Sequence, residues 1–543
     1  MWPVLFDGLS IVSEKWPIIL GATGVVWLGC GIIIFLSRKL SQEKPVPWQS
    51  AVLLGCFLGF SLFLRLAYLT RLFVPPYFDS VEHFRIINEL VNALESSTLL
   101  KTLPTLVPSY YHLGFHFLAS LLAMGLRADP IEVILILGQV ILTTIPFPIF
   151  FLIQSETHSD AAAFWGILLA GFGWYMPGFA VNWGKYPALG GLLVLELVLG
   201  IAYSITLKKT ARNRPLLIVT LALAILVSTL FHTRTLVIIA IAFASWVVAG
   251  RLQVRFVVSR YISFVVLLAG ILILGILIWK NPLLKLTLEP YLIDGGWITL
   301  AVVILNPFAF AKFPLGVYFN ILLILSVFAA MFIPVGNWLP GFENQTLLDR
   351  PFVEILLFLP LSILGGLGLA GLLQFLSDIP GIPEQSRFHA RLLTTIVVLG
   401  SAGLMSIRNY DFYPSDCCGF VGYDDTVALD WLDKNLPSDA HVLIATTQMN
   451  VLSSGPSPNL AGADAGIWIP ALTGRKTTPA PFDTDFRSKD TLAQLCQKHI
   501  DYVYIGGTAQ VFNASRLYAR TDWYKKILSL PNAQLFQVTG CSK

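Results

Sequence analysis

Charged residues are scarce in this sequence: Asp, Glu, Lys and Arg make up 13% of its 543 residues, about half the share expected of a soluble globular protein. This scarcity excludes a soluble enzyme, a disordered chain and a nucleic-acid-binding protein. The formal net charge of +4 is too small to indicate an anionic polymer as a partner. We therefore expect no nucleic acid among its partners.

Three catalytic signatures are also missing from the sequence. It has no GxxxxGK[ST] loop to hold the phosphates of a nucleotide, no GxSxG turn to carry a nucleophilic serine and no HExxH helix to bind zinc. Only six cysteines are present, and none has the CxxC or histidine spacing of a zinc site. The cofactor is left unknown: a divalent metal fits the sequence but is not required by it.

Apolar residues, in contrast, supply 55% of the chain, and the mean hydropathy is +0.72. They gather in runs long enough to cross a hydrocarbon layer of roughly 30 Å as helices. We predict an α-helical polytopic membrane protein with about twelve transmembrane helices plus interfacial helices, the first helix being a retained span rather than a cleaved signal. The predicted spans are residues 17–36, 48–69, 130–153, 161–180, 187–207, 215–231, 235–250, 256–279, 297–313, 315–333, 351–376 and 392–407.

Basic residues between the spans predict the orientation of the chain, because cytoplasmic loops are enriched in Lys and Arg. The strongest basic cluster falls at residues 208–214, which we place in the cytoplasm. A further span at residues 110–126 would break the alternation that this cluster requires, so we interpret that stretch as an interfacial helix. Residues 70–129 then form one long external loop.

The last quarter of the chain differs in composition. Residues 408–543 hold 12 basic and 13 acidic residues among 136, or 18%, against 11% in residues 1–407. Helical spacing at residues 426–435 and strand-like runs at residues 441–446 and 501–505 predict a small α/β domain. The alternation of the spans places this soluble domain outside the cytoplasm, where its cysteines can form a disulfide if that space is oxidising.

These patterns predict a transmembrane module over residues 1–407 and a soluble extracytoplasmic domain over residues 408–543. We expect an integral, multi-pass protein of a bacterial plasma membrane.

The external loop carries the residues best suited to chemistry. Asp79 follows the second span closely, and apolar residues recur at helical spacing from Val81 to Leu94, which predicts an amphipathic surface helix. Glu82 and His83 lie three and four residues after Asp79 and share its face of that helix. An ionisable group at the membrane boundary is disfavoured unless it is paired, hydrated or used. We take these three residues as the candidate catalytic group.

The order of these features resembles the GT-C class of polytopic glycosyltransferases, which includes protein O-mannosyltransferases, aminoarabinose transferases and the catalytic subunits of oligosaccharyltransferases. In that class an acidic residue just past the membrane is followed by an amphipathic helix and a proline-introduced interfacial helix. Here these are Asp79, residues 80–94 and residues 108–116. Residues 428–437 are similar to the helix that opens the external domain of several bacterial members.

The resemblance implies transfer of a sugar from a polyprenyl-phosphate donor, within the lipid bilayer, to a glycan, lipid or protein acceptor. The chain departs from the mannosyltransferases because it has one acid at Asp79 in place of an adjacent pair. Asp79 suits the base that takes the proton of the acceptor. With Glu82 three residues later it also suits a capping box, which stabilises a helix start without any catalytic role. Glu82 and His83 fit either a metal site or a solvated helix face.

Three further candidates for substrate binding lie between two spans. Lys185 stands between Trp183 and Tyr186, after Gly184, which permits a tight turn. This arrangement suits the gripping of a lipid phosphate. It suits equally well an aromatic anchor at the interface, whose lysine extends to water.

His232 and two arginines complete the candidate substrate-binding group. Arg234 follows His232 at the end of a short span, and its guanidinium can bind a diphosphate through two parallel hydrogen bonds. Arg350 is a third candidate cation, or a charge in a loop.

The main alternative function is a transporter or flippase of lipid-linked glycans, in which the same cations form a transit path. Such a protein needs polar residues deep in several spans, commonly with repeated halves, whereas the charges here gather at one face and we find no repeat. A third hypothesis is a non-catalytic scaffold that presents the terminal domain. In that domain, residues 464–475 suit either a carbohydrate-binding loop or a loop that packs on the membrane module.

Overall fold

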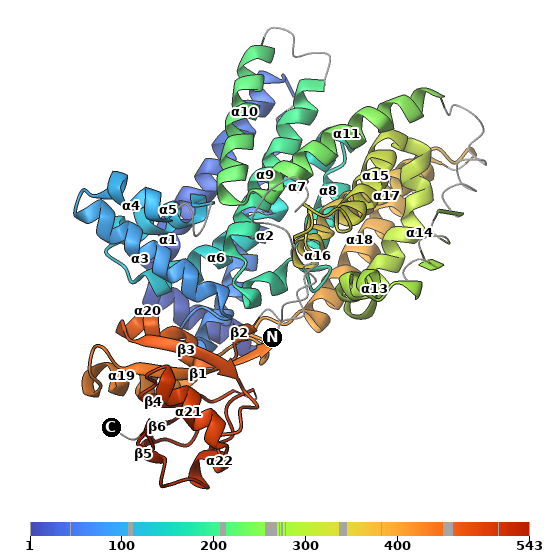
Figure 1. Ribbon diagram of the computed structural model, residues 1–543. Coiled ribbons are helices and arrows are strands. Elements are labelled where there is room, and N and C mark those ends of the chain that lie inside the picture. The colour runs from blue at the N-terminus through green and yellow to red at the C-terminus, as the bar shows by residue number, and fades with distance from the viewer. Residues whose placement is uncertain are drawn as a thin grey trace.

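The computed structural model shows a helical membrane module followed by a small C-terminal domain with one sheet (Figure 1). The fold class predicted from the sequence is confirmed. The structure describes residues 2–43, 45–106, 112–206, 213–255, 279–335, 345–381, 383–448, 460–508 and 510–541, together with residues 269, 270, 272, 275 and 276. Residues 108–111 of the predicted interfacial helix, most of the predicted span 256–279 and most of the basic cluster at residues 208–214 lie outside them.

The first half of the membrane module runs from the N-terminus to the end of the fourth long span. Its helices are α1 (Trp2–Leu40), α2 (Trp48–Leu66), η1 (Ala67–Arg71), α3 (Asp79–Glu95), α4 (Leu99–Leu106), α5 (Gly114–Leu126), α6 (Pro130–Thr144), α7 (Pro146–Thr157), α8 (Asp160–Phe172), η2 (Gly178–Trp183) and α9 (Tyr186–Thr206).

The second half of the membrane module leads to the linker that enters the C-terminal domain. Its helices are α10 (Arg214–Phe231), α11 (Arg234–Arg255), α13 (Pro282–Glu289), η4 (Pro290–Asp294), α14 (Gly296–Lys312), α15 (Pro314–Ala330), α16 (Arg350–Leu356), α17 (Phe358–Ser377) and α18 (Glu384–Asn409).

Fewer helices than the predicted twelve are long and apolar enough to span a membrane among the described residues. Seven segments qualify by length and composition, and an eighth is added if Pro282–Ile293 and Gly296–Lys312, bent by 91°, form one span. Three helices at predicted spans are too short to be counted by themselves: α8, α14 and α15 have 13, 17 and 17 residues. The seven segments are Trp2–Leu40, Trp48–Arg71, Pro130–Thr157, Tyr186–Thr206, Arg214–Phe231, Arg234–Leu252 and Arg350–Ser377.

Two of the predicted external-loop helices are present. Helix α3 covers Asp79–Glu95 and buries Phe84, Ile87 and Leu90 on one face, as its helical spacing predicts. Helix α5 has 13 residues, so at 1.5 Å per residue it is too short to cross a layer of roughly 30 Å. Its length agrees with the predicted interfacial helix.

Helix α1 starts earlier than the predicted span. It begins at Trp2 and is kinked at Lys15, whose φ and ψ of −113° and 19° are not helical. Pro17 explains the kink, because its ring lacks an N–H and clashes with the carbonyl group four residues before it. At this kink, the ammonium group of Lys15 pairs with Glu132 near the start of α6, at 2.6 Å.

The helices form two arms that diverge from the middle of the module (Figure 1). Helices α9 and α10 lie in one arm, helices α14, α15, α17 and α18 in the other, and α11 runs between them. An apolar cavity of about 570 Å³ lies between the arms, lined by side chains of α7, α9, α10, α11, α15 and α17. Its lining includes Leu236 and Phe243 of α11.

The C-terminal domain is built on a six-stranded mixed sheet. Strand β1 pairs in parallel with β3 and β4 and antiparallel with β2, and β6 pairs antiparallel with β4 and β5. Helix α19 and strands β1 and β4 confirm the three elements predicted from the sequence. The elements are α19 (Tyr423–Asn435), β1 (His441–Gln448), β2 (Leu460–Gly462), η5 (Ala465–Trp468), α20 (Ile469–Thr473), β3 (Lys476–Pro481), α21 (Lys489–Gln497), β4 (Tyr502–Ile505), α22 (Ala514–Tyr518), β5 (Tyr524–Ser529) and β6 (Gln534–Val538).

The C-terminal domain packs on the helix that begins with Asp79. Trp468 is fully buried, and its ring lies 5.6 Å from that of Phe84 in α3. Arg475 is also buried, where it pairs with Asp433 and donates to the carbonyl group of Leu436. Residues 464–475 therefore pack on the membrane module and on their own domain, which is one of the two roles expected for them.

Two disulfides lie in the C-terminal part of the chain. Cys417 bonds to the adjacent Cys418, and Cys496 bonds to Cys541, 45 residues later. The second bridge ties the end of α21 to the segment after β6. It closes the part of the chain that holds β4, β5 and β6 into one loop.

We predict that replacing Cys496 and Cys541 together by serine destabilises the C-terminal domain. In the chain-entropy model a loop of this length is worth roughly 4 kcal/mol, so the apparent melting temperature of the purified full chain, followed by tryptophan fluorescence, should fall by several degrees. Cys56→Ser is the matched control, because Cys56 is a free, exposed cysteine of α2. Equal melting of the double variant and the wild type would contradict the prediction.

Candidate functional site

The centre of the candidate site is an ion pair between two helix starts. Asp79 is the first residue of α3, and its carboxylate pairs with the ammonium group of Lys185, which stands between η2 and α9. The two side chains are 25% and 31% exposed. Burial opposes the charge of Lys185, but the carboxylates of Asp79 and Asp349 outweigh it and hold the pKa of Lys185 above its ordinary value.

Asp79 does not cap the helix. The N-cap position belongs to Phe78, and no side chain makes a capping hydrogen bond there. Glu82, the other half of the expected capping box, pairs with Arg85 instead, and both side chains are more than a third exposed. The prediction that Asp79 caps the helix is therefore wrong, because its carboxylate pairs with Lys185 instead. Glu82 lies on the outer face of α3, away from the pair.

His83 holds the two helix starts together. Its Nε2 lies 3.0 Å from the carbonyl oxygen of Gly184, and its Nδ1 lies 3.0 Å from Nε2 of His116. A carbonyl group only accepts, so Nε2 of His83 carries the proton and Nδ1 accepts from His116. His83 thus fixes the residue next to Lys185 and acts as a positioning residue.

Gly184 is required by the same contact. Its φ of +63° lies in the left-handed region, and a Cβ there would stand 2.5 Å from Oγ of Ser80 in α3. Only glycine allows both the backbone conformation and the approach. The turn predicted at Gly184 is confirmed, and it delivers Lys185 to Asp79.

A second ion pair joins two more helix starts. Arg234 is the first residue of α11 and pairs with Asp349, the N-cap of α16. The other carboxylate oxygen of Asp349 accepts from the backbone N–H of Phe352 at 2.9 Å. Arg350 follows and pairs with Glu354 at 2.7 Å. Asp349 therefore serves both as a cap and as the partner of Arg234.

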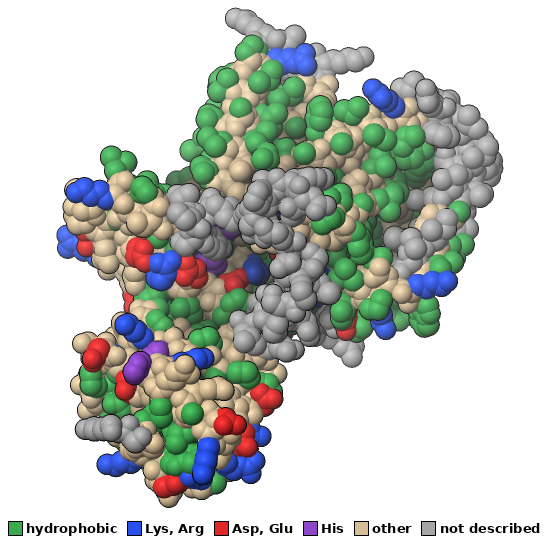
Figure 2. Space-filling model, viewed as in Figure 1, with side chains coloured by type: hydrophobic (Ala, Val, Ile, Leu, Met, Phe, Trp, Pro, Cys, Tyr) green, Lys and Arg blue, Asp and Glu red, His purple; other side chains and the backbone are tan. Residues whose placement is uncertain are grey.

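The two ion pairs act on one another. The Asp349 carboxylate raises the pKa of Lys185. Burial raises the pKa of the Tyr77 hydroxyl, which Lys185, Asp79 and Arg350 shift further in opposite directions. Three cations and three carboxylates, that of Glu354 included, therefore share one region. Figure 2 shows acidic, basic and histidine side chains at the base of a recess on this face of the molecule.

Two further histidines lie beside the arginine. The rings of His112 and His232 lie 4.6 Å apart, and His232 stacks on Phe352 at 4.8 Å. Burial, together with the charges of Arg234 and Lys185, lowers the pKa of His112 to about 3. These imidazoles are neutral at physiological pH and add no positive charge to the site.

The aromatic neighbours of Lys185 differ in their surroundings. Tyr186 is 1% exposed and its ring stacks on Phe115 at 5.8 Å. Trp183 is partly buried and packs edge-on against Phe179 at 5.3 Å. Tyr186 thus packs in the interior of the module, and its part in substrate binding stays a prediction.

The structure brings together Asp79, His83, Lys185, Arg234 and Arg350, and it leaves Glu82 outside. Sequence reasoning missed Asp349. The signal was present, since Asp349 precedes Arg350 and Pro351, and an acidic residue before a proline is typical of a helix start. Among the described residues, no group of three His, Cys, Asp or Glu side chains is placed to hold a metal ion.

We predict that His83 makes the protein sensitive to mild acid. Burial lowers its pKa to about 4, whereas an unfolded histidine has a pKa of about 6.5. The unfolded chain therefore binds the proton first, so stability that is complete above pH 6.5 is lost as the pH falls towards 4, by roughly 2 kcal/mol between pH 7 and pH 5.

The measurement is the apparent melting temperature of the purified protein at pH 7 and pH 5. The fall in melting temperature from pH 7 to pH 5 should be clearly smaller in His83→Gln than in the wild type. In His389→Gln, at an exposed position of α18, it should equal that of the wild type. An unchanged fall in His83→Gln would show that His83 does not carry this effect.

Comparisons with known proteins give distant structural likenesses, one of them to an oligosaccharyltransferase. In the crystal structure of the Archaeoglobus fulgidus oligosaccharyltransferase in complex with zinc and sulfate, 67% of the chain aligns with 82% of this one at 11% identity and a TM-score of 0.43. No curated protein sequence gives a significant match. The model of a protein family matches residues 2–342, well over half of the chain. The chain therefore belongs to that family, the family of unknown function DUF6541.

Proposed function

We propose that the protein is an integral-membrane glycosyltransferase that moves a sugar from a polyprenyl-phosphate-linked donor to an acceptor on the extracytoplasmic face, with Asp79 as the base. The observation that carries the proposal is the meeting of the Asp79–Lys185 and Arg234–Asp349 ion pairs. Together they supply a carboxylate to take a proton and cations to hold a phosphate.

The electrostatics of the site favour an anionic ligand. Lys185 and Arg234 stand at the starts of α9 and α11, where the positive ends of the helix dipoles add to their charge. A cation at a helix start is disfavoured, because the positive end of the helix dipole repels it. A phosphate group relieves that cost, because it binds both the side chain and the helix end.

The apolar cavity between the two arms suits the tail of a lipid donor. It has a volume of about 570 Å³, and its lining includes Leu236, two residues after Arg234. A polyprenyl chain in this cavity would bring its phosphate to the starts of the helices. The head group and the tail of one donor thus have adjoining places.

The transfer step follows from this placement. The oxygen of an acceptor hydroxyl forms a bond to the anomeric carbon of the sugar, and the bond from that carbon to the phosphate oxygen breaks. The acceptor proton goes to the carboxylate of Asp79, and the bonding electrons leave with the polyprenyl phosphate. Lys185 and Arg234 hold that negative charge. When Lys185 turns to the phosphate, it also releases the carboxylate of Asp79 to act as the base.

The disulfides support the proposed orientation. Disulfides persist in oxidising spaces and are rare in the cytosol, and both bridges lie in the segment from Cys417 to Cys541. A C-terminal domain outside the cytoplasm agrees with them. Since this domain packs on α3, the same orientation places Asp79 at the extracytoplasmic end.

One observation favours the alternative, a transporter or flippase of lipid-linked glycans. Glu196 of α9 is 2% exposed, and neither carboxylate oxygen has a hydrogen-bond partner among the described residues. An ionisable residue inside a span is a mark of transport pathways. Glu196 therefore becomes the residue to test if sugar transfer is absent.

We predict that Asp79→Asn lowers the rate of sugar transfer by a factor of about 10² to 10⁴, because asparagine cannot take a proton. Membranes with equal amounts of wild type and variant, checked by immunoblot, are supplied with radiolabelled polyprenyl-phosphate sugars. The matched control is Glu82→Gln, a carboxylate of the same helix that faces Arg85 at the surface.

Loss of transfer in Asp79→Asn with activity kept in Glu82→Gln is the expected outcome. Equal transfer in Asp79→Asn and the wild type would refute Asp79 as the base. If the wild type itself transfers no sugar, the movement of a labelled lipid-linked glycan across the membrane is measured for the wild type and for Glu196→Gln. Movement in the wild type that is lost in Glu196→Gln would support the transporter.

A further inference from the structure

A second cavity lies apart from the candidate site. It is bounded by α2, α6, the segment after α8, η2 and the linker that follows α18, and its volume is about 40 Å³. A space of this size holds a few water molecules or one small ionic group. None of Asp79, Lys185, Arg234 and Asp349 lines it.

Arg65 of α2 places a positive charge on the wall of this cavity. The residue is 3% exposed. Its guanidinium donates to the hydroxyl of Tyr410 and to the carbonyl oxygen of Gly171, and it lies 5.0 Å from the ring centres of Phe172 and Tyr410. All these partners are neutral. An arginine cannot shed its proton at ordinary pH, so a buried guanidinium without a negative partner is costly.

Two donor groups on the cavity wall have no acceptor among the described residues. They are Nε of Arg65 and Nε2 of Gln139 in α6, which is 2% exposed. The nearby amide oxygen of Asn182 is already used, because it accepts from the hydroxyl of Tyr68 at 2.9 Å and from the N–H of Ser415 at 2.8 Å. A ligand for this cavity must therefore bring acceptors and negative charge.

One acidic residue also lines the cavity. Asp411 is exposed at its rim, and one of its oxygens accepts from the backbone N–H of Tyr413 at 2.9 Å. Water screens a charge at an exposed position far better than a charge in the interior. The carboxylate of Asp411 thus weakens the binding of an anion at the mouth of the cavity, but it does not neutralise the buried Arg65.

We propose that this cavity binds a phosphate group, with the guanidinium of Arg65 and the amide of Gln139 as its donors. The site is independent of the transfer site proposed above. Arg65 lies six residues before the end of the span Trp48–Arg71. Either a phospholipid head group or free inorganic phosphate supplies the same oxygens.

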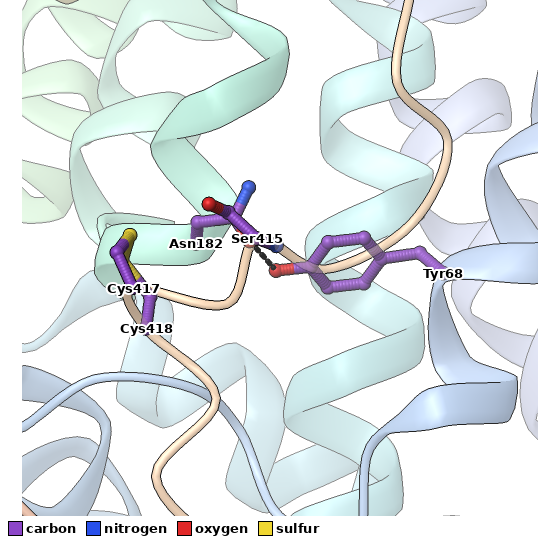
Figure 3. Close-up of a disulfide and its surroundings, with 5 residues drawn as sticks. All are labelled: Tyr68, Asn182, Ser415, Cys417 and Cys418. Atoms are coloured by element: carbon purple, nitrogen blue, oxygen red, sulfur yellow. Dashed lines mark hydrogen bonds between the residues drawn. A yellow bond between two sulfur atoms is a disulfide. The ribbon is translucent and has the colours of Figure 1, made fainter. Parts of the chain in front are cut away.

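The linker to the C-terminal domain lines one side of the cavity. Figure 3 shows Tyr68, Asn182 and Ser415 together beside the Cys417–Cys418 disulfide. The carbonyl oxygen of Cys418 accepts from the N–H of Tyr77, two residues before Asp79. A phosphate group bound to Arg65 therefore steadies the segment that holds the C-terminal domain against α3.

The test measures binding through stability, since a ligand that binds the folded state raises its melting temperature. The purified full chain in detergent is titrated with inorganic phosphate, and in parallel with dihexanoyl phosphatidylglycerol, against sodium chloride of equal ionic strength. We expect a saturable rise in the apparent melting temperature with at least one probe. A rise with the phospholipid alone assigns the site to a lipid, and a rise with inorganic phosphate assigns it to the free anion.

Variants place the binding at this cavity. Arg65→Gln should weaken the apparent affinity at least about tenfold, because it removes a charge-assisted hydrogen bond. Gln139→Leu should also weaken it and keeps the charge, so it tests the site even if Arg65→Gln fails to fold. Lys101→Gln removes an exposed charge from α4, outside the residues that line the cavity, and should leave binding unchanged. No rise with either probe, or a rise kept in full by both cavity variants, overturns the proposal.

Discussion

A charge at the boundary of a hydrocarbon layer is tolerated only when it is paired, hydrated or used, and this constraint sets how the helices of the protein meet. The Asp79–Lys185 pair joins α3 to α9, and the Arg234–Asp349 pair joins α11 to α16. Each pair connects helix starts that are far apart in the chain. Removing one partner would leave the other partly buried and uncompensated, which costs far more than an exposed ion pair contributes.

Neutral contacts then position the charges. His83 links α3 to the Gly184 carbonyl through one nitrogen and to His116 through the other. It keeps that geometry only while it is neutral, because a protonated Nδ1 would no longer accept. The site thus combines charged side chains with a buried, uncharged frame behind them. In the proposed transfer, this frame would let Lys185 exchange Asp79 for the phosphate without moving the turn that carries it.

The sequence was sufficient for those features that depend on local chemistry. Apolar runs predict the membrane helices, the spacing from Val81 to Leu94 predicts α3, and the glycine at Gly184 predicts the turn before Lys185. Two features escaped it. The sequence assigns Asp79 to a helix cap as readily as to a catalytic base, and it does not predict the ion pair, since only the fold brings Lys185 beside Asp79. Asp349 was missed because its partner Arg234 stands 115 residues earlier, a separation that no local pattern covers.

A short segment connects the two polar regions of the molecule. Asn182 holds Tyr68 and the linker at Ser415, Gly184 touches α3, and Lys185 pairs with Asp79. These contacts are all made by residues 182–185, so a displacement of the linker at Asn182 is transmitted to Lys185 over three residues. The C-terminal domain meets the same region from the other side, through Trp468 on α3. The placement of that domain and the geometry of the Asp79–Lys185 pair are therefore coupled through rigid contacts, and neither can change without strain on the other.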